Sequence, residues 1–323
     1  MTKQPARNPA ARLRPFRSGL CLFGVFIVAV AVLAFTAAWT AAPMNYPEKT
    51  PAGGSLEAKY LARGKHRVEA FRTGAAAPME HITVFFPEEM RTGAGRWPVV
   101  VMVNGTGIMP NGYQAVFRHL ASWGFIVIGN DDPSTWSGES ADRTLEWLLE
   151  ENENPESIFF NRVDIGNIGI SGHSQGGIGV LNAVTIQPHA NLYRTAVTLS
   201  PTNDESAERL HWSCNLEAVG IPTMMIAGTD GDFETRMVIP LERMREMYRK
   251  LPSSKLMVRR KGCGHGETLY AADGYVTAWF MWLLRSDGEA AKAFTGPVPE
   301  IKVNSLYRNL HIDIPADFAP IKP

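Results

Sequence analysis

Short apolar runs alternate along this chain with stretches in which apolar residues recur at helical spacing. Two runs, His81–Phe86 and Pro98–Val103, read as strands, and the second is continuously apolar, as a strand covered on both faces is. Further strands are expected at Phe125–Ile128, Asn167–Ser171, Ala196–Ser200, Thr223–Ala227 and Leu256–Val258. Helices are expected between them, at Tyr113–Trp123, Ala141–Glu150, Gln175–Val184, Met237–Lys250 and Tyr275–Leu284. This alternation predicts an α/β fold with a mainly parallel central sheet and helices on both faces.

The amino-acid composition excludes several classes of protein. The 323 residues are 45% hydrophobic and 20% charged, enough to bury a sizeable core. The 32 Lys and Arg balance 32 Asp and Glu, which argues against nucleic acid as a partner. Three cysteines without a paired CxxC exclude a disulfide scaffold and a structural zinc site of the usual kind.

The amino-terminal part predicts export. Residues 1–18 are basic and carry no acidic residue, so they are expected to stay in the cytoplasm. Residues 19–42 carry no charge at all and exceed the roughly 20 residues that span a membrane. They are either a signal anchor, which would attach the protein to the membrane, or a cleaved signal peptide. Residues 43–65 are expected to be a linker, and residues 66–323 one domain with a short carboxyl-terminal tail outside the cytoplasm.

A nucleophile is predicted where the strand Asn167–Ser171 ends. The sequence continues as GHSQGG, so Ser174 is the centre of a G-x-S-x-G pattern between a strand and a helix. A serine in such a turn has a strained backbone, and Gly172 and Gly176 provide the room that larger side chains would occupy. Because ligands of open α/β sheets bind beyond the carboxyl ends of strands, Ser174 lies where a site is expected.

Together with WGFIVIGNDD before it and GTDGDF after it, the run GISGHSQGG resembles the α/β-hydrolase superfamily. Within it, the chain is similar to single-domain esterases related to cutinases, polyester hydrolases, chlorophyllases and platelet-activating-factor acetylhydrolases. The resemblance covers residues 66–285. It implies an α/β-hydrolase fold and a catalytic triad in the chain order Ser, Asp, His, with no cofactor.

The resemblance also implies where the base and the acid lie. The base follows the last core strand, which selects His265 in the run GCGHG among eight histidines, with His311 as a rival. His173, adjacent to the serine, is expected to be structural. The acid follows the strand Thr223–Ala227, where Asp232 is preferred and Asp230 is the alternative.

Two backbone N–H groups are expected to stabilise the oxyanion. One belongs to Gln175, the residue after the nucleophile, and the resemblance implies that Thr106 supplies the other. Thr106 lies in the run NGTG after the strand Pro98–Val103. A nucleotide-binding turn is the alternative for this run, but the third glycine of that pattern is missing.

Other residues shape expectations about the cleft. Residues 201–220 are too few for a lid domain, so no large lid is expected. Trp136 and Trp212 either stack on a substrate or are partly buried surface aromatics. Cys214 and Cys263 are expected either to form a disulfide bridge with each other or to remain free thiols. Asp131 and Asp132 are interpreted as turn and helix-capping residues and not as metal ligands, since no His, Asp or Glu cluster is near them in the sequence.

These features predict an exported or membrane-anchored serine hydrolase that cleaves carboxylic esters, either small or polymeric, through an acyl-enzyme on Ser174. An acyltransferase or peptidase on the same scaffold is one alternative, and a non-catalytic binding protein with a hydrolase-like fold is the other.

Overall fold

A computed structural model describes residues 42–108, 110–315 and 318. Its central sheet has nine strands in the order β1-β2-β4-β3-β5-β6-β7-β8-β9. Pairing is parallel from β4 through β8, and β1, β2 and β9 run antiparallel to their neighbours. The strands are Val68–Gly74, His81–Pro87, Trp97–Val103, Ile126–Asn130, Val163–His173, Tyr193–Leu199, Thr223–Gly228, Lys255–Arg260 and Tyr307–Asp313. The predicted α/β fold with a mainly parallel sheet is therefore confirmed.

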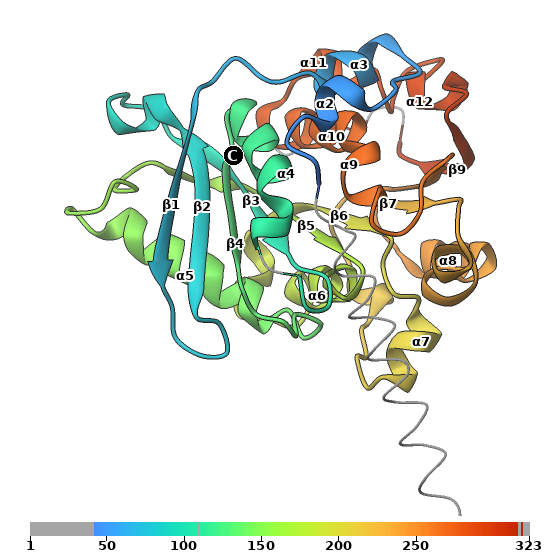
Figure 1. Ribbon diagram of the computed structural model, residues 1–323, viewed down its shortest axis with the longest axis horizontal. Coiled ribbons are helices and arrows are strands. Elements are labelled where there is room, and N and C mark those ends of the chain that lie inside the picture. Colours follow the sequence, from blue (N-terminus) through green and yellow to red (C-terminus); the bar gives the residue numbers. More distant parts are fainter. Residues whose placement is uncertain (1–41, 109, 316–317, 319–323) are drawn as a thin grey trace, which may run out of the picture.

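Helices cover both faces of the sheet (Figure 1). The longer ones are α4 (Pro110–Ser122), α5 (Glu139–Glu153), α6 (Gln175–Ala183), α8 (Leu241–Lys250) and α10 (Asp273–Arg285). Strand β3 shows why two cores form, because alternate side chains of a strand point to opposite faces. Val100 and Met102 pack with α4 and α10, whereas Val99 and Val101 pack with α5, α6 and α8.

Shorter helical elements lie in the connections. They are α2 (Tyr46–Lys49), α3 (Ser55–Leu61), α7 (Asp204–Arg209), α9 (Thr268–Ala271), α11 (Gly288–Ala291) and α12 (Glu300–Val303), with short 3-10 turns at 88–91, 190–192 and 216–218. Between β6 and β7 the chain forms only α7 and one 3-10 turn, so the prediction that no large lid is inserted there is confirmed.

The helix predicted at Met237–Lys250 is divided in two. A π-helical turn, η4, spans Phe233–Val238, and α8 begins only at Leu241. Pro240 separates them, because proline has no N–H to donate to a preceding carbonyl and is favoured just before or at the start of a helix. This division places η4 directly after β7, at the carboxyl edge of the sheet.

The segment 43–65, expected to be a linker, is instead folded onto the domain. The side chains of Tyr46 and Tyr60, in α2 and α3, are almost fully buried. The Tyr46 hydroxyl donates to Asp273 at the start of α10, and the Tyr60 hydroxyl donates to Asp287 at 2.8 Å. The polar composition of the segment concealed these partners, which lie more than two hundred residues away in the chain.

The carboxyl-terminal residues are likewise more ordered than a tail. They form β9, which pairs antiparallel with β8. The buried carboxylate of Glu57 in α3 accepts hydrogen bonds from Asn304 (2.7 Å) and from the hydroxyl of Tyr307 (2.6 Å). The two ends of the described chain therefore stabilise each other.

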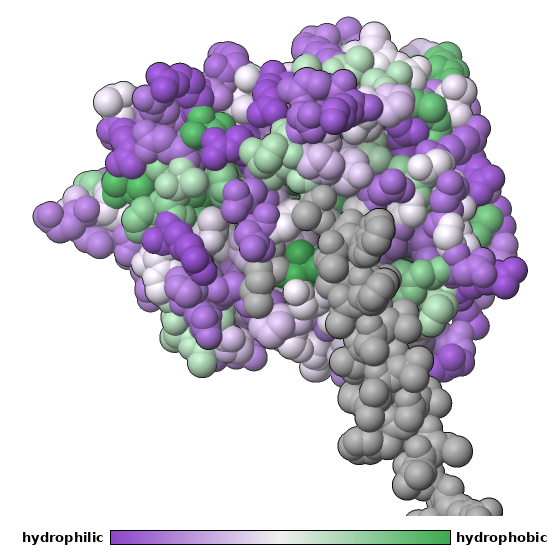
Figure 2. Space-filling view, viewed as in Figure 1, coloured by the Kyte–Doolittle hydropathy of each residue, from purple (hydrophilic) through white to green (hydrophobic). Residues whose placement is uncertain are grey.

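Two predicted segments, the basic residues 1–18 and the apolar residues 19–42, lie outside the described residues except for Ala42. In the part that is described, no helix has the length and apolar character needed to cross a bilayer. Polar residues dominate the face of the molecule seen in Figure 2, with smaller hydrophobic areas between them.

Candidate active site

Ser174 lies between the last residue of β5 and the first residue of α6. Its backbone angles are φ 59° and ψ −120°, outside the regions that L-residues favour. Three backbone hydrogen bonds support this conformation: Ser174 N–H donates to Leu199 (2.9 Å), and its carbonyl accepts from Gly177 (2.9 Å) and Thr202 (3.2 Å). Backbone strain held in place by surrounding structure is typical of a catalytic residue.

The flanking glycines are required by close approaches of the backbone. A Cβ atom at Gly172 would lie 2.2 Å from the carbonyl oxygen of Gly176. A Cβ atom at Gly176 would lie 2.3 Å from the carbonyl oxygen of Val103 at the end of β3. Neither contact is tolerable, so the G-x-S-x-G pattern follows from the packing of this turn against the neighbouring strand.

His265 lies in the loop between β8 and α9, with its side chain 9% exposed. Its Nδ1 atom is 2.8 Å from Oε2 of Glu234, whose side chain is fully buried. Hydrogen bonding to a carboxylate fixes Nδ1 as the protonated nitrogen and leaves the Nε2 lone pair free to accept a proton.

The carboxylate beside His265 is therefore Glu234 and not Asp232, which the sequence favoured. The side chain of Asp232 is 80% exposed and forms an ion pair with Arg236 at 3.4 Å. Asp230, the alternative, accepts a hydrogen bond from the hydroxyl of Thr229 at 2.7 Å on the surface. The first turn of η4 directs the side chain of Glu234 inward. The sequence indicates only that a carboxylate follows Gly228 and not which of the nearby acidic side chains points into the domain.

The carboxylate of Glu234 is held by three donors. Besides His265 they are the hydroxyl of Ser200 (2.7 Å) and the backbone N–H of Gly228 (2.6 Å). Burial alone would raise the pKa of Glu234, but the hydrogen bond and charge of His265 and the bonds from Ser200 and Gly228 hold it below its ordinary value. A buried, ionised carboxylate paired with an imidazole is the arrangement that stabilises imidazolium.

His173 contacts the same loop. Its Nε2–H donates to the backbone carbonyl of His265 at 2.8 Å, and the two rings are 4.6 Å apart between centroids. Burial, together with the nearby charge of His265, lowers the pKa of His173 to about 3. A neutral His173 thus fixes the position of the loop that carries His265, which agrees with the structural role expected for it. The rival base, His311, lies in β9 against Tyr248.

The loop between β3 and α4, which contains Thr106, is braced on both sides. The N–H of Gly105 donates to the hydroxyl of Tyr113 (2.8 Å), and the carbonyl of Asn104 accepts from the hydroxyl of Thr135 (2.7 Å). This loop lies against the serine turn, since a Cβ atom at Gly176 would be 2.5 Å from the carbonyl oxygen of Asn104. Gln175 begins α6, so its N–H has no partner within the helix.

The remaining candidates are placed as follows. Cys214 and Cys263 are both free thiols, so the bridge between them that the sequence left open is not formed. Trp136 and Trp212 are partly buried and pack against the hydrophobic core that α5 and α6 cover. Asn182 connects their loops by donating to the carbonyls of Trp136 (2.8 Å) and Ser213 (3.0 Å).

A strained serine after the central parallel strand and a buried His–Glu pair on the loops after β7 and β8 define the chain as an α/β-hydrolase. It belongs to the PET hydrolase-like family, whose pattern it matches over residues 41–279. This confirms the resemblance to esterases of the cutinase and polyester hydrolase group.

Characterised relatives agree with this assignment. The chain is 30% identical over 174 residues to a bis(hydroxyethyl) terephthalate hydrolase of Streptomyces coelicolor, which covers 53% of this chain and 50% of the relative. It is 27% identical over 236 residues to cutinase cut1 of Thermobifida fusca, covering 71% and 68%. It is 32% identical over 97 residues to a chloroplastic chlorophyllase-1 of Citrus sinensis, covering 26% and 28%. The chain thus spans half the length of the first relative and about two thirds of the second.

Proposed function

We propose that this protein hydrolyses carboxylic esters through an acyl-enzyme on Ser174, with His265 as the base and Glu234 as the acid of the triad. The observation that carries the proposal is the buried Glu234–His265 hydrogen bond of 2.8 Å on the sheet edge where the strained Ser174 lies. A strained serine backbone and a buried carboxylate both depend on the surrounding structure to hold them, and such groups are concentrated at functional sites.

In the first half-reaction the Ser174 oxygen attacks the carbonyl carbon of the ester while its proton passes to Nε2 of His265. The N–H groups of Gln175 and Thr106 donate to the oxygen that becomes negative. Glu234 stays ionised and stabilises the imidazolium through Nδ1. When the carbon–oxygen bond to the alcohol breaks, His265 returns the proton to the leaving oxygen.

In the second half-reaction water replaces the alcohol. His265 takes a proton from water as the water oxygen attacks the acyl carbon, and it returns that proton to the Ser174 oxygen as the acid leaves. The same groups therefore act twice, and no cofactor is needed for the balance of protons and electrons.

Small and polymeric carboxylic esters are the proposed substrates. The relatives named above are a terephthalate ester hydrolase, a cutinase and a chlorophyllase, which supports an ester as the common feature. The short connection between β6 and β7 supports an uncovered cleft that admits extended substrates.

The test is hydrolysis of p-nitrophenyl butyrate by the purified full chain, a Ser174→Ala variant and a Ser55→Ala control. Ser55 is exposed and bonds only Glu300, far from the triad in the fold. The wild type and the control are expected to release nitrophenol, and Ser174→Ala to lose at least a thousandfold of the rate. Equal rates in all three would refute the proposal, and release that requires an added alcohol or amine acceptor would replace hydrolysis by acyl transfer.

We also propose that the domain acts outside the cytoplasm, either secreted or held at the membrane. Support comes from the basic residues 1–18 followed by the uncharged residues 19–42. Protease added to intact cells should degrade a membrane-held domain, and a secreted one should be found in the surrounding fluid. A protected domain that is released only by lysis would contradict export.

A further inference from the structure

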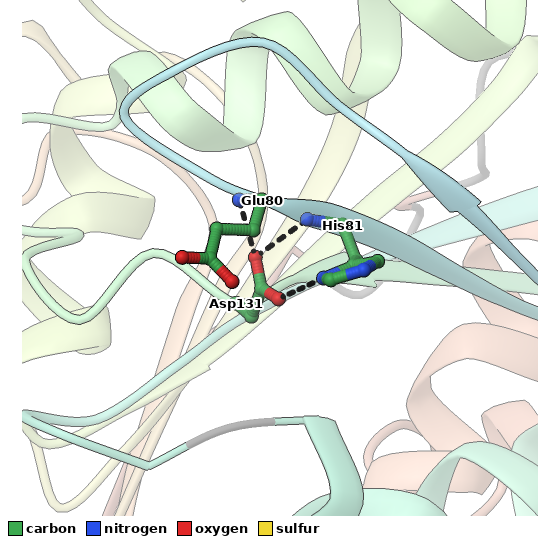
Figure 3. Close-up of side chains that lie close together, drawn as sticks. All are labelled: Glu80, His81 and Asp131. Atoms are coloured by element: carbon green, nitrogen blue, oxygen red, sulfur yellow. Dashed lines mark hydrogen bonds and ion pairs between the residues drawn. The ribbon is translucent and has the colours of Figure 1, made fainter.

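Three potential metal ligands meet at the flank of the sheet, outside the candidate active site (Figure 3). His81 is the first residue of β2, Glu80 directly precedes it, and Asp131 directly follows β4. One ligand atom from each side chain can be chosen so that all three lie within 4.8 Å of one another. The sequence concealed this cluster, because only the antiparallel pairing of Ile82 with Asn130 brings the two segments together.

The carboxylate of Asp131 is oriented by the backbone. Its Oδ1 accepts hydrogen bonds from the N–H groups of Glu80 and His81, both at 2.8 Å. These two bonds fix the carboxylate, and Oδ2, which faces the His81 imidazole, is the oxygen that can bind a cation.

The distance between Oδ2 and the imidazole suits a shared metal. His81 Nδ1 and Asp131 Oδ2 are 2.9 Å apart. Two ligands bound to one tetrahedral zinc at about 2.0–2.2 Å lie roughly 3.3 Å from each other. Replacing the proton between the two atoms by a metal ion thus requires them to separate by only a few tenths of an ångström.

Space for the rest of the coordination shell is available beside the cluster. Glu80 and Asp131 line a cavity of about 330 Å³, which Asn111 and Gln114 of α4 also line. The exposed side chain of Glu80 can turn toward Asp131, which would leave the fourth position of a tetrahedral shell to a water molecule. The guanidinium of Arg72 lies 3.7 Å from Asp131 Oδ2, and its side chain is 61% exposed. A positively charged side chain is therefore already close to the oxygen that would bind the metal ion.

We propose that Glu80, His81 and Asp131 bind a divalent transition metal ion, with Zn²⁺ as the best match. An imidazole with two carboxylates favours zinc over calcium or magnesium, which prefer oxygen ligands alone. Three protein ligands and a water molecule complete a tetrahedral shell.

The site would act on stability and not on the chemical step. Residues 131–135 brace the loop that carries Thr106: Pro133 accepts from the N–H of Gly107 at 3.4 Å, and the hydroxyl of Thr135 donates to Asn104. A metal ion that joins Asp131 to the start of β2 would hold one end of this brace. Because it binds the folded state, the ion would raise the melting temperature, and the rise would grow with the logarithm of the free Zn²⁺ concentration above Kd.

The experiment is calorimetric titration of the EDTA-treated, buffer-exchanged full chain with ZnCl₂, together with its thermal unfolding. One ion per chain and a raised melting temperature are expected for the wild type. His81→Gln and Glu80→Gln should each weaken binding by about tenfold or more, the equivalent of one lost ligand contact. His311→Gln, an exposed histidine on β9, is the matched control and should bind as the wild type does.

Arg72→Gln is the most specific variant for testing the site, because it is expected to strengthen binding and not to weaken it. Removing the guanidinium that competes for Asp131 should strengthen Zn²⁺ binding by about three- to tenfold. The proposal is overturned if the wild type shows no saturable binding, if His81→Gln binds Zn²⁺ as tightly as the wild type, or if Ca²⁺ binds as tightly as Zn²⁺. Calorimetric binding and thermal unfolding do not depend on ester hydrolysis. The metal site is therefore tested independently of the proposed function.

Discussion

Oε2 of Glu234 lies 2.8 Å from Nδ1 of His265, and the side chain of Glu234 is wholly removed from solvent. Its carboxylate is also bonded to Ser200 and Gly228, so its position is fixed by β6 and β7 as well as by the histidine. The pair therefore belongs to the interior of the fold, whereas Asp232, two residues earlier, faces water.

Glu234→Gln is expected to lower kcat for ester hydrolysis by about 10²–10⁴-fold, because an amide cannot stabilise the imidazolium and can bind the wrong tautomer of His265. Asp232→Asn, the matched control, should retain nearly the full rate. Steady-state kinetics of both variants decides between the two carboxylates. A large loss in Asp232→Asn with little loss in Glu234→Gln would restore the assignment made from sequence.

Glu234 should also make stability depend on pH. Its folded pKa is lowered from the ordinary value of 4.5, so it contributes stability that is present above that value and is lost as the pH falls through the folded pKa. The difference in unfolding free energy between the wild type and Glu234→Gln should therefore be largest near neutral pH and shrink in acid. Urea denaturation at a series of pH values measures it, and a difference independent of pH would contradict the assigned ionised state.

His173 should act as a positioning residue for His265. His173→Phe removes the N–H that donates to the His265 carbonyl, and kcat is expected to fall about tenfold with KM little changed, since the substrate contacts remain. His173→Gln keeps a donor and should recover part of the rate. If both variants match the wild type in kcat, the hydrogen bond has no part in placing the base.

The amino-terminal segment should contribute to stability. Tyr46→Phe removes the buried hydroxyl that donates to Asp273 and is expected to destabilise the protein by about 1–3 kcal/mol, because the carboxylate stays buried with one donor fewer. Glu48→Gln, which removes an exposed ion pair with Arg63, is the control and should leave the stability unchanged. Thermal unfolding of the two variants tests this. Equal melting temperatures would mean that the hydrogen bond from Tyr46 to Asp273 makes no net contribution to stability.

The parts of the fold that the sequence predicts are those fixed by local pattern. The apolar strands around Val100 and the turn at Ser174 follow from residues that are neighbours in the chain, and the loop with His265 follows from the resemblance. Glu234 was missed because its role depends on which way a π-helical turn directs a side chain. The sequence does not indicate the proposed metal-ligand cluster, because His81 and Asp131 meet only through antiparallel pairing. It does not indicate the packing of Tyr46 either, because the partner of Tyr46 is 227 positions away.

The most direct test of the account is the reaction of the folded full chain with a fluorophosphonate, located by mass spectrometry of its peptides. A single adduct on Ser174 is the predicted result, because only a serine with an adjacent base is nucleophilic at neutral pH. A wild-type chain that forms no adduct, or forms it at another residue, would contradict the assignment of Ser174 as the nucleophile.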